Sequence, residues 1–424
     1  MKKLLSILLI MSISLSIILT GCISNNENET SNINSSIDYS KDMQIFYHCA
    51  GSGYAPVTKS DRGYYYISKG KDEKKFIIYV DRKTQRATPL CSKPDCMHNN
   101  VNTCDAFVNI SEEIIIDSML GSLGNVIQYY EGSLYMICGE YDKSMIEYNT
   151  YLMKMDADGS NRKKITGYFD NIITNWFIHK GYFYYTSDSS ILRKPLSDMD
   201  NDPDVVYKAK YFVKGNENTF DEIYAYKNYI YFIVNEKNAN GDGEGEASLC
   251  INLDTMEKSY LKIGNNSAYF NAFAGDSMIL TYTNNKEKVY VKTDLQGKNG
   301  EKVFTQSKNE ISSITSDGTY YYFDNAYQVY KNPDIKQTIT VYDENMQVVD
   351  TFMLPEMDTN TYNFFTPQDE EYFLLENYND AGEHFLVMAD KSQIGSIKGK
   401  MIKYKELCSL DCDNIEANQY AVKG

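Results

Sequence analysis

One hydrophobic pattern recurs along most of the chain: a turn residue followed by a short run of aromatic and aliphatic residues. The turn residues of the successive copies are Gly63, Gly132, Gly181, Asn228, Asp276, Gly318 and Glu371. Their spacings are 69, 49, 47, 48, 42 and 53 residues, and most of these lie near the period of roughly 40–50 residues that is typical of propeller blades. The sequence therefore predicts an all-β fold, a β-propeller of about seven four-stranded blades. The copies at Asp276 and Glu371 are weak, which leaves six or eight blades open.

A second apolar run follows most copies and ends at an aspartate. These aspartates are Asp81, Asp156, Asp254, Asp294, Asp343 and Asp390. Because Asp favours tight turns, each is expected to open the hairpin between the outer strands of a blade. The segments between the runs carry Asn, Lys, Asp and Gly and no convincing helical period, which argues against a two-domain α/β chain. The segment 156–161, Asp-Ala-Asp-Gly-Ser-Asn, resembles a turn of Tol-type periplasmic propellers, and this resemblance concerns blade geometry alone.

The N-terminus has the features of an export signal. Lys2 and Lys3 precede an uncharged apolar stretch from Leu4 to Leu19, which is short for a membrane span and typical of a cleaved signal peptide. The following Leu19-Thr20-Gly21-Cys22 resembles the lipobox of bacterial lipoproteins. The resemblance implies removal of residues 1–21 and acylation of Cys22, whereas a plain signal peptide with a chance cysteine is the alternative. Residues 22–42 are rich in Asn, Ser, Glu and Thr and are expected to be a flexible tether. The propeller is then assigned to residues 43–424.

Charge and aromatic content narrow the choice of partners. The formal net charge is −16, and removal of Lys2 and Lys3 with the signal would make it −18. Such an acidic surface repels nucleic-acid phosphates, so nucleic-acid binding is disfavoured. The chain contains 38 Tyr against 18 Phe. Tyrosine-rich loops near the channel, with Trp176 as an example of a loop aromatic, would suit a peptide, glycan or protein partner.

A cysteine-rich insertion at about residues 91–118 lies in or after the first blade. Cys91, Cys96, His98 and Cys104 are four ligands suited to tetrahedral zinc within fourteen positions. Their spacing is not that of a standard zinc finger, and in an extracellular protein a disulfide is the competing interpretation. Free thiols are a third. The segment resembles one in a group of uncharacterised Gram-positive lipoprotein propellers, in which Cys-x-Lys-Pro-Asp-Cys-x-His follows a Pro-Leu-Cys element. This resemblance implies fold and location but no activity.

The other candidate sites have little support. Cys138 and Cys250 lie in apolar runs and are expected to be inert core thiols. Cys49, Cys408 and Cys412 complete the eight cysteines other than Cys22, an even number that permits but does not require full pairing. Cys408 and Cys412 are candidates to pair with each other or with the first blade. The acidic segments 198–204 and 238–244 resemble calcium loops, but solvated acidic turns explain them more simply.

Catalysis is weakly indicated, and no catalytic residue is assigned. His48, His179 and His384 are scattered along the chain, and no G-x-S-x-G elbow is present. We expect a lipid-anchored protein on the outer face of the cytoplasmic membrane that acts as a ligand-binding or protein-interaction scaffold through its propeller face. The alternatives are an extracellular hydrolase or lyase acting on polysaccharide or peptide with channel carboxylates, and a cell-envelope assembly factor. The sequence indicates neither the ligand nor the oligomeric state.

Overall fold

A computed structural model describes the greater part of the chain after residue 42. The described residues are 43–44, 57–69, 75–100, 102–108, 127–141, 148–169, 173, 175–187, 189–210, 220–237, 243–284, 287–307, 313–332, 334–354, 364–366, 371–378 and 384–409. All of them belong to the unit that spans Ile37–Gly424, and a separate unit covers Met1–Ser36. Among the described residues no helix is long and apolar enough to cross a membrane. The apolar stretch after Lys3 lies outside them.

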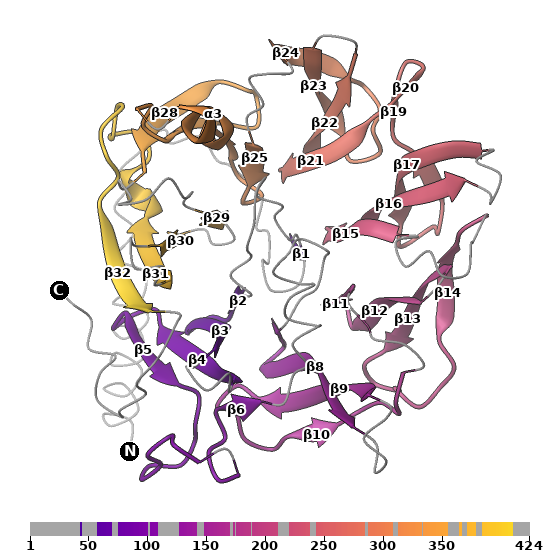
Figure 1. Cartoon of the computed structure of the whole chain (residues 1–424). Helices are drawn as coiled ribbons and strands as arrows, with labels where there is room; N and C mark the ends of the chain where they lie inside the picture. Colours follow the sequence, from indigo (N-terminus) through magenta and orange to yellow (C-terminus); the bar gives the residue numbers. More distant parts are fainter. Residues whose placement is uncertain are drawn as a thin grey trace, which may run out of the picture. The chain divides into compact units, whose positions relative to one another are not determined.

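The described residues of the unit Ile37–Gly424 form a seven-bladed β-propeller of antiparallel sheets (Figure 1). Each blade uses four strands that are consecutive along the chain. Blade 1 consists of β2 (Val57–Lys59), β3 (Gly63–Lys69), β4 (Lys75–Asp81) and β5 (Arg86–Pro89), and blade 2 consists of β7 (Gln128–Tyr130), β8 (Ser133–Tyr141), β9 (Tyr148–Asp156) and β10 (Lys163–Lys164). Blade 3 consists of β11 (Trp176–His179), β12 (Tyr182–Ser187), β13 (Ser190–Pro195) and β14 (Asp204–Lys208), and blade 4 consists of β15 (Phe220–Tyr226), β16 (Tyr229–Lys237), β17 (Gly243–Asn252) and β18 (Lys258–Tyr260).

Blades 5 to 7 continue the same order. Blade 5 consists of β21 (Tyr269–Ala274), β22 (Ser277–Thr283), β23 (Glu287–Asp294) and β24 (Glu301–Ser307). Blade 6 consists of β25 (Ser313–Ser316), β26 (Tyr321–Asp324), β27 (Thr338–Tyr342) and β28 (Val348–Met353). Blade 7 consists of β29 (Phe364–Thr366), β30 (Tyr372–Tyr378), β31 (His384–Asp390) and β32 (Tyr404–Ser409). The first strand of a blade lies nearest the centre and the fourth lies outermost, as blades 3 and 5 show in Figure 1. The prediction of about seven four-stranded blades is confirmed.

The recurring hydrophobic runs form the two middle strands of each blade. The Gly63 copy becomes β3 and the run before Asp81 becomes β4, and the weak copies at Asp276 and Glu371 lead into β22 and β30. The aspartates stand at or just after the end of the third strand, as predicted. Middle strands are recognisable in the sequence because neighbouring blades cover both of their faces, so they read as continuous apolar runs. Many of the first and fourth strands are shorter, and outermost strands such as β10 are more polar.

The tyrosines of these strands form the core between the blades. Tyr66, Tyr231 and Tyr321 are fully buried, and their rings supply large apolar area. Buried hydroxyl groups reach hydrogen-bond acceptors in the next blade: Tyr226 Oη donates to Gly275 O at 3.0 Å. Trp176 lies in β11 and is buried. The prediction that Trp176 is a loop aromatic is therefore wrong, because the indole packs into the core against Phe183.

Blade 7 and blade 1 meet through side chains, and among the described residues no strand of one blade pairs with a strand of the other. Leu374 and Met388 of blade 7 pack with the core of blade 1. Arg82 Nη2 lies 3.0 Å from Glu371 Oε2 across the same junction. Closure by packing follows from blades that are each built from consecutive strands.

Besides the 3₁₀ helix η1 (Lys391–Gln393), four elements of the described residues lie outside the regular blades: one helix, two single strands and one hairpin. A short helix, α3 (Ala326–Lys331), connects two strands of blade 6, although no helical period was predicted. The strand β1 (Met43–Gln44) pairs with β15, the innermost strand of blade 4. A two-stranded hairpin of β19 (Lys262–Ile263) and β20 (Asn266–Ser267) stands between blades 4 and 5. The fourth element, β6 (Phe107–Val108), pairs with β4 of blade 1.

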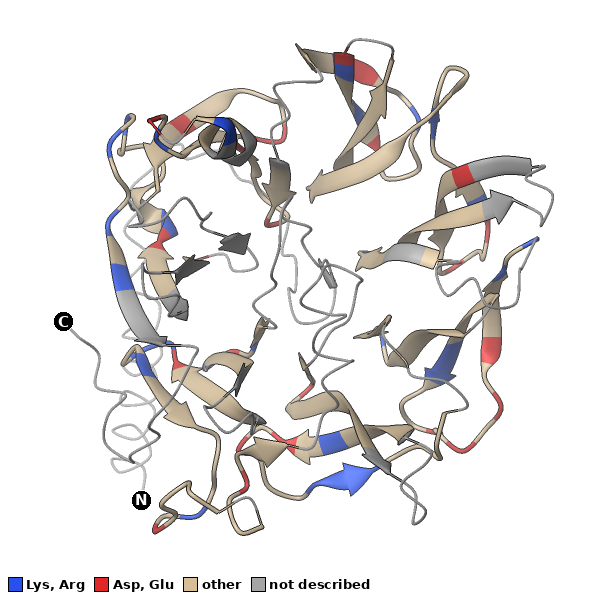
Figure 2. Cartoon of the chain, viewed as in Figure 1, with Lys and Arg blue, Asp and Glu red and all other residues tan. Residues whose placement is uncertain are grey.

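Charged residues lie mainly in turns and outer strands. Figure 2 shows much of the described ribbon as uncharged, with acidic residues in the connecting turns and Lys-Lys in the outermost strand β10. The acidic residues that the structure describes thus lie both in turns and within strands, many of them at strand ends.

Candidate metal centre

The cysteine-rich segment leaves blade 1 from its outer strand and returns to the same sheet. β5 ends at Pro89, and the chain comes back as β6 alongside β4. Both limbs are held by one residue of β4: Leu90 N donates to Ile77 O, and Ile77 N donates to Ala106 O, each at 2.8 Å. Cys91 follows Leu90 and Cys104 precedes Ala106 by two residues. Backbone pairing with Ile77 therefore brings the first and last cysteines together.

Turns inside the loop direct the remaining two ligands to the same point. Cys96 N donates to Lys93 O at 3.2 Å, and Cys104 N donates to Asn100 O at 3.0 Å. His98 has a φ of 52°, in the left-handed region. This conformation costs a non-glycine residue free energy and is maintained where the surroundings demand it.

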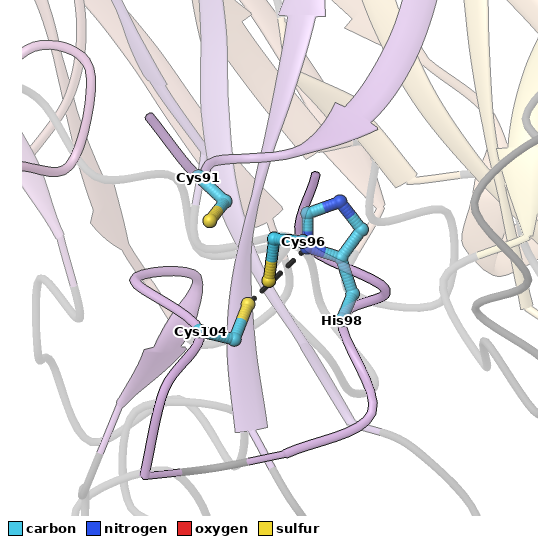
Figure 3. Close-up of side chains that lie close together, drawn as sticks. All are labelled: Cys91, Cys96, His98 and Cys104. Carbon is cyan, nitrogen blue, oxygen red and sulfur yellow. Dashed lines mark hydrogen bonds between the residues drawn. The ribbon is translucent and has the colours of Figure 1, made fainter. Parts of the chain in front are cut away.

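Four ligand atoms converge within this loop. The sulfurs of Cys91, Cys96 and Cys104 and a ring nitrogen of His98 all lie within 4.8 Å of one another, and Figure 3 shows the four side chains turned toward a common point. His98 Nδ1 lies 3.2 Å from Cys104 Sγ. The three cysteines are free thiols in this structure.

The surroundings affect the protonation of each ligand. Partial burial raises the pKa of Cys91, but backbone N–H groups of Lys93 and Asp105 and the neighbouring thiols outweigh it, so the pKa is lowered. Burial raises the pKa of Cys104 to about 12. Burial also lowers the pKa of His98, which favours the neutral imidazole that coordinates metals. The set thus contains one thiol that ionises readily and one that needs a cation to do so.

Polar contacts outside the cluster join the two limbs a second time. Lys93 Nζ lies 2.8 Å from Asp105 Oδ1 and donates to Thr103 O at 2.6 Å. Ser92 Oγ donates to Asp105 Oδ2 at 2.9 Å. These contacts are exposed to solvent, where each ion pair contributes little, about 0–1 kcal/mol. They orient the loop more than they stabilise it.

The structure brings together all four residues predicted for the metal or disulfide site. Cys138 and Cys250 are buried, and burial raises the pKa of each to about 12, as expected for inert core thiols. In the described part of the chain, the carboxylates of 198–204 do not form a metal-type cluster; Asp204 pairs with Arg193 at 3.4 Å.

Several residues considered as candidate sites lie outside the part of the chain that the structure describes. Residues 238–242 of the second calcium-like segment, together with Cys22, Cys49, His48 and Cys412, fall outside the described residues, and the side chains of Cys408 and His384 are likewise not described. His179 ends β11 and is buried, in line with a packed histidine.

Sequence reasoning missed the residue from blade 2 that approaches the loop. Arg162 Nη1 donates to Phe107 O at 2.6 Å. The signal in the sequence is slight, an arginine directly after the Asp156–Asn161 turn. It also missed a buried ion pair between blades 6 and 7, in which Lys391 Nζ lies 2.5 Å from Asp317 Oδ2. Both contacts join residues more than fifty positions apart.

Comparison with known proteins supports the fold. No protein-family model matches the chain, and no curated protein matches it. A puromycin-hydrolysing peptidase from Mycobacterium tuberculosis is similar over 88% of this chain and 54% of its own, with 10% identity and a TM-score of 0.52. TolB from Acinetobacter baumannii aligns over 82% of this chain and 80% of its own, with 13% identity and a TM-score of 0.35. The propeller domain of the Trilobed protease from Pyrococcus furiosus aligns over 84% of this chain and 98% of its own, with 8% identity and a TM-score of 0.48. At 10% identity, the likeness to the puromycin-hydrolysing peptidase concerns the fold alone.

Proposed function

We propose that Cys91, Cys96, His98 and Cys104 hold a structural Zn²⁺ ion. The observation that carries this proposal is the convergence of four ligand atoms within 4.8 Å. Zinc–sulfur bonds of about 2.3 Å in a tetrahedron place ligand atoms roughly 3.8 Å apart. A contraction of about 1 Å at the widest pair would therefore complete the site. Three thiolates and an imidazole are also the donor set that selects zinc over hard cations.

The ion would act as a cross-link. Four protein ligands fill a tetrahedral zinc site and leave no position for water or substrate, which is typical of structural centres. The loop itself buries little apolar surface, because most residues between Cys91 and Asn100 are exposed. A segment with so little core needs a covalent or metal cross-link to stay ordered. Zinc supplies that link between the limb at Cys91 and the limb at Cys104.

Metal content and thiol accessibility of the full chain purified in detergent test the zinc site. We expect one zinc per chain, with Cys91, Cys96 and Cys104 unreactive toward a thiol reagent until a chelator is added. Cys138→Ser is the matched control, because that buried thiol lies outside the cluster and should leave zinc content unchanged. A metal-free chain in which two of the three cysteines resist alkylation even after chelation would show a disulfide instead.

We further propose that the propeller is a lipid-anchored, extracytoplasmic binding scaffold. The signal-like N-terminus and the lipobox-like Cys22 support the anchor. The chain from Cys22 to Met43 can span at most roughly 70 Å, which would allow a folded body to stand clear of a membrane. The pairing of β1 with β15 supports a binding role, because it shows that the innermost strand of blade 4 accepts an extended segment at its edge.

Anchoring and binding have separate tests. Cys22→Ser should release the protein from the membrane fraction and abolish labelling by palmitate, whereas Cys138→Ser should change neither. Cross-linking on intact cells followed by purification of the full chain should recover one fixed extracytoplasmic protein. Release of products from a peptide or polysaccharide by the purified chain would instead favour the hydrolase or lyase alternative.

A further inference from the structure

A single turn of blade 2 contacts both limbs of the cysteine loop. The turn runs from Asp156 to Arg162. A Cβ atom added at Gly159 would lie 2.9 Å from Leu90 O, so the turn packs against the residue that precedes Cys91. At the other limb, Arg162 Nη1 donates to Phe107 O at 2.6 Å. Arg162 Nε also donates to Gly159 O at 3.2 Å, which makes the two contacts one unit.

Two hydrogen bonds from backbone N–H groups connect this limb, next to the Phe107 carbonyl, with the ligand Cys104. Phe107 N donates to Cys104 O at 3.4 Å. Ala106 N donates to Cys104 Sγ at 3.4 Å. A guanidinium that holds Phe107 O therefore also limits where the Cys104 sulfur can lie. Peptide N–H groups and carbonyls of this kind orient metal ligands in known sites.

The charge of the site favours nearby cations, of which the loop supplies one, the exposed Lys93. Three thiolates, a neutral imidazole and Zn²⁺ sum to a net charge of −1. Within the loop, Lys93 is paired with Asp105 and largely neutralised by it. Arg162 is half-buried, and its Nη2 atom is buried with no hydrogen-bond partner among the described residues. An unpaired buried guanidinium N–H is costly unless a negative charge lies nearby.

The electrostatics of Arg162 agree with that location. Burial lowers the pKa of Arg162, and the nearby Cys138, Asp105, Cys104 and Cys91 act in the opposite direction. Two of these four groups are ligands of the proposed site, so the guanidinium lies within range of its charge.

We propose that Arg162 is the positioning and charge-balancing residue of the metal site, so that metal binding in blade 1 fastens blade 2 to it. The inference rests on the proposed zinc site. It assigns the loop a role between blades, because the ion would hold Leu90 and Phe107 at the spacing that the turn Asp156–Arg162 contacts. The fourth strand of blade 2, β10, begins directly after Arg162, so the outer edge of that blade would be ordered together with the metal loop.

The test compares zinc affinity in variants of the full chain purified in detergent. Arg162→Met keeps most of the apolar stem of the side chain and removes its charged, hydrogen-bonding head, and Arg162→Lys keeps the charge without the forked donor. We expect zinc to bind about 10- to 100-fold more weakly to Arg162→Met, as for other residues that orient metal ligands, with partial recovery in Arg162→Lys. Lys163→Met is the matched control, because Lys163 is exposed one residue away and should leave the affinity unchanged.

Hydrogen exchange on the unmutated chain gives a second measurement that does not depend on a variant folding. Zinc should slow exchange in residues 157–164 of blade 2 as well as in the loop, and slowing confined to residues 90–108 would overturn the inference. Equal zinc affinity in Arg162→Met and the wild type would also overturn this inference while leaving the zinc site intact. Absence of zinc from the wild type would overturn the proposed site and the inference together.

Discussion

Two junctions between blades are built on the same turn but hold very different insertions. The turn after β9 of blade 2 and the turn after β23 of blade 5 have matching hydrogen bonds. Asp156 N donates to Ser160 O at 2.9 Å, and Asp294 N donates to Lys298 O at 3.0 Å. Asn161 and Asn299 donate to the aspartates at 2.7 and 2.8 Å.

Each of these turns also packs a glycine against the connection from the preceding blade. Gly159 meets Leu90 beside the cysteine loop, and Gly297 meets Leu261 beside the β19–β20 hairpin. Both glycines have positive φ, at 84° and 76°, which other residues adopt only at a cost. The same turn therefore occurs at both junctions, and the junctions differ in the insertion that the turn contacts.

The hairpin between blades 4 and 5 is stabilised by apolar burial. Leu261 is 1% exposed and Ala268 is completely buried, within a cluster that includes residues of both blades. In the cysteine loop, Met97 is 62% exposed, and the inward-facing groups are thiols and an imidazole. Both insertions are flanked by buried residues, Leu261 and Ala268 in one and Leu90 and Ala106 in the other, and they differ because the cysteine loop also brings four potential metal ligands together.

The largest expected effect is the loss of the apolar anchor at the hairpin. Leu261→Ala should lower the free energy of unfolding by about 2–5 kcal/mol, because it opens a cavity in a closed core. The loss should be the same with and without a metal chelator. Met97→Ala is the control in the other insertion and should change stability by less than about 0.5 kcal/mol. Denaturant midpoints measure both, and a chelator-dependent loss in Leu261→Ala would contradict the comparison.

Acid should weaken the junction between blades 3 and 4, which has neither insertion. His179 Nε2 lies 2.7 Å from Lys227 O, and burial lowers the pKa of the imidazole to about 4 despite that contact. The unfolded chain therefore binds a proton at higher pH than the folded one. Stability is fully present above about pH 6.5 and is lost as the pH falls toward 4, by about 2–3 kcal/mol.

Unfolding measured at pH 7 and pH 4.5 checks this expectation. The loss over this interval should be smaller in His179→Gln than in the wild type. It should remain in Leu261→Ala and in Cys104→Ser, because His179 lies at a different junction. An equal pH dependence in His179→Gln and the wild type would show that other groups govern the acid response.

Alanine substitution of the two glycines should have an intermediate effect on stability, and this effect should differ between the two junctions. Alanine at Gly159 would place Cβ 2.9 Å from a backbone oxygen, which cannot move without shifting the limb that carries Cys91. Alanine at Gly297 would meet the flexible end of Leu261 at 2.9 Å. In both variants the alanine must adopt a positive φ, which costs about 1 kcal/mol. We expect Gly159→Ala to cost about 2–3 kcal/mol and Gly297→Ala about 1–2 kcal/mol in unfolding experiments, and the reverse order would contradict the packing described.

The smallest expected difference lies in the turn aspartates. The Asp294 carboxylate accepts hydrogen bonds from Gln296 N and Lys298 N, each at 2.9 Å, as well as from Asn299. In the other turn Asp158, not Asp156, accepts from Ser160 N. Asp294→Ala should therefore destabilise the protein by about 1 kcal/mol more than Asp156→Ala. Thermal unfolding of the two variants side by side measures this, and equal losses would show that the two carboxylates contribute alike.

Much of the fold was predictable because the middle strands are local patterns. The runs after Gly63 and Gly318 are mainly aromatic and aliphatic, and each pairs with the next run in the chain. The innermost and outermost strands of the blades were not predictable in this way. β10 is two lysines, and it becomes a strand only because β9 offers it an edge. The pairing of β1 with β15 joins segments some 180 residues apart, and nothing in Met43–Gln44 indicates it.

The repeat, the turn positions and the four ligand types near Cys91 can be identified from the sequence, because each of these is a property of neighbouring residues. Tertiary structure alone decided that Ile77 would join the two limbs of the loop, that Trp176 would be buried, and that Arg162 would arrive from another blade. The physical reason is that blades pack face to face. A residue in one blade meets partners displaced by a full repeat, so which side chain fills a given space depends on closure of the ring and not on the local pattern.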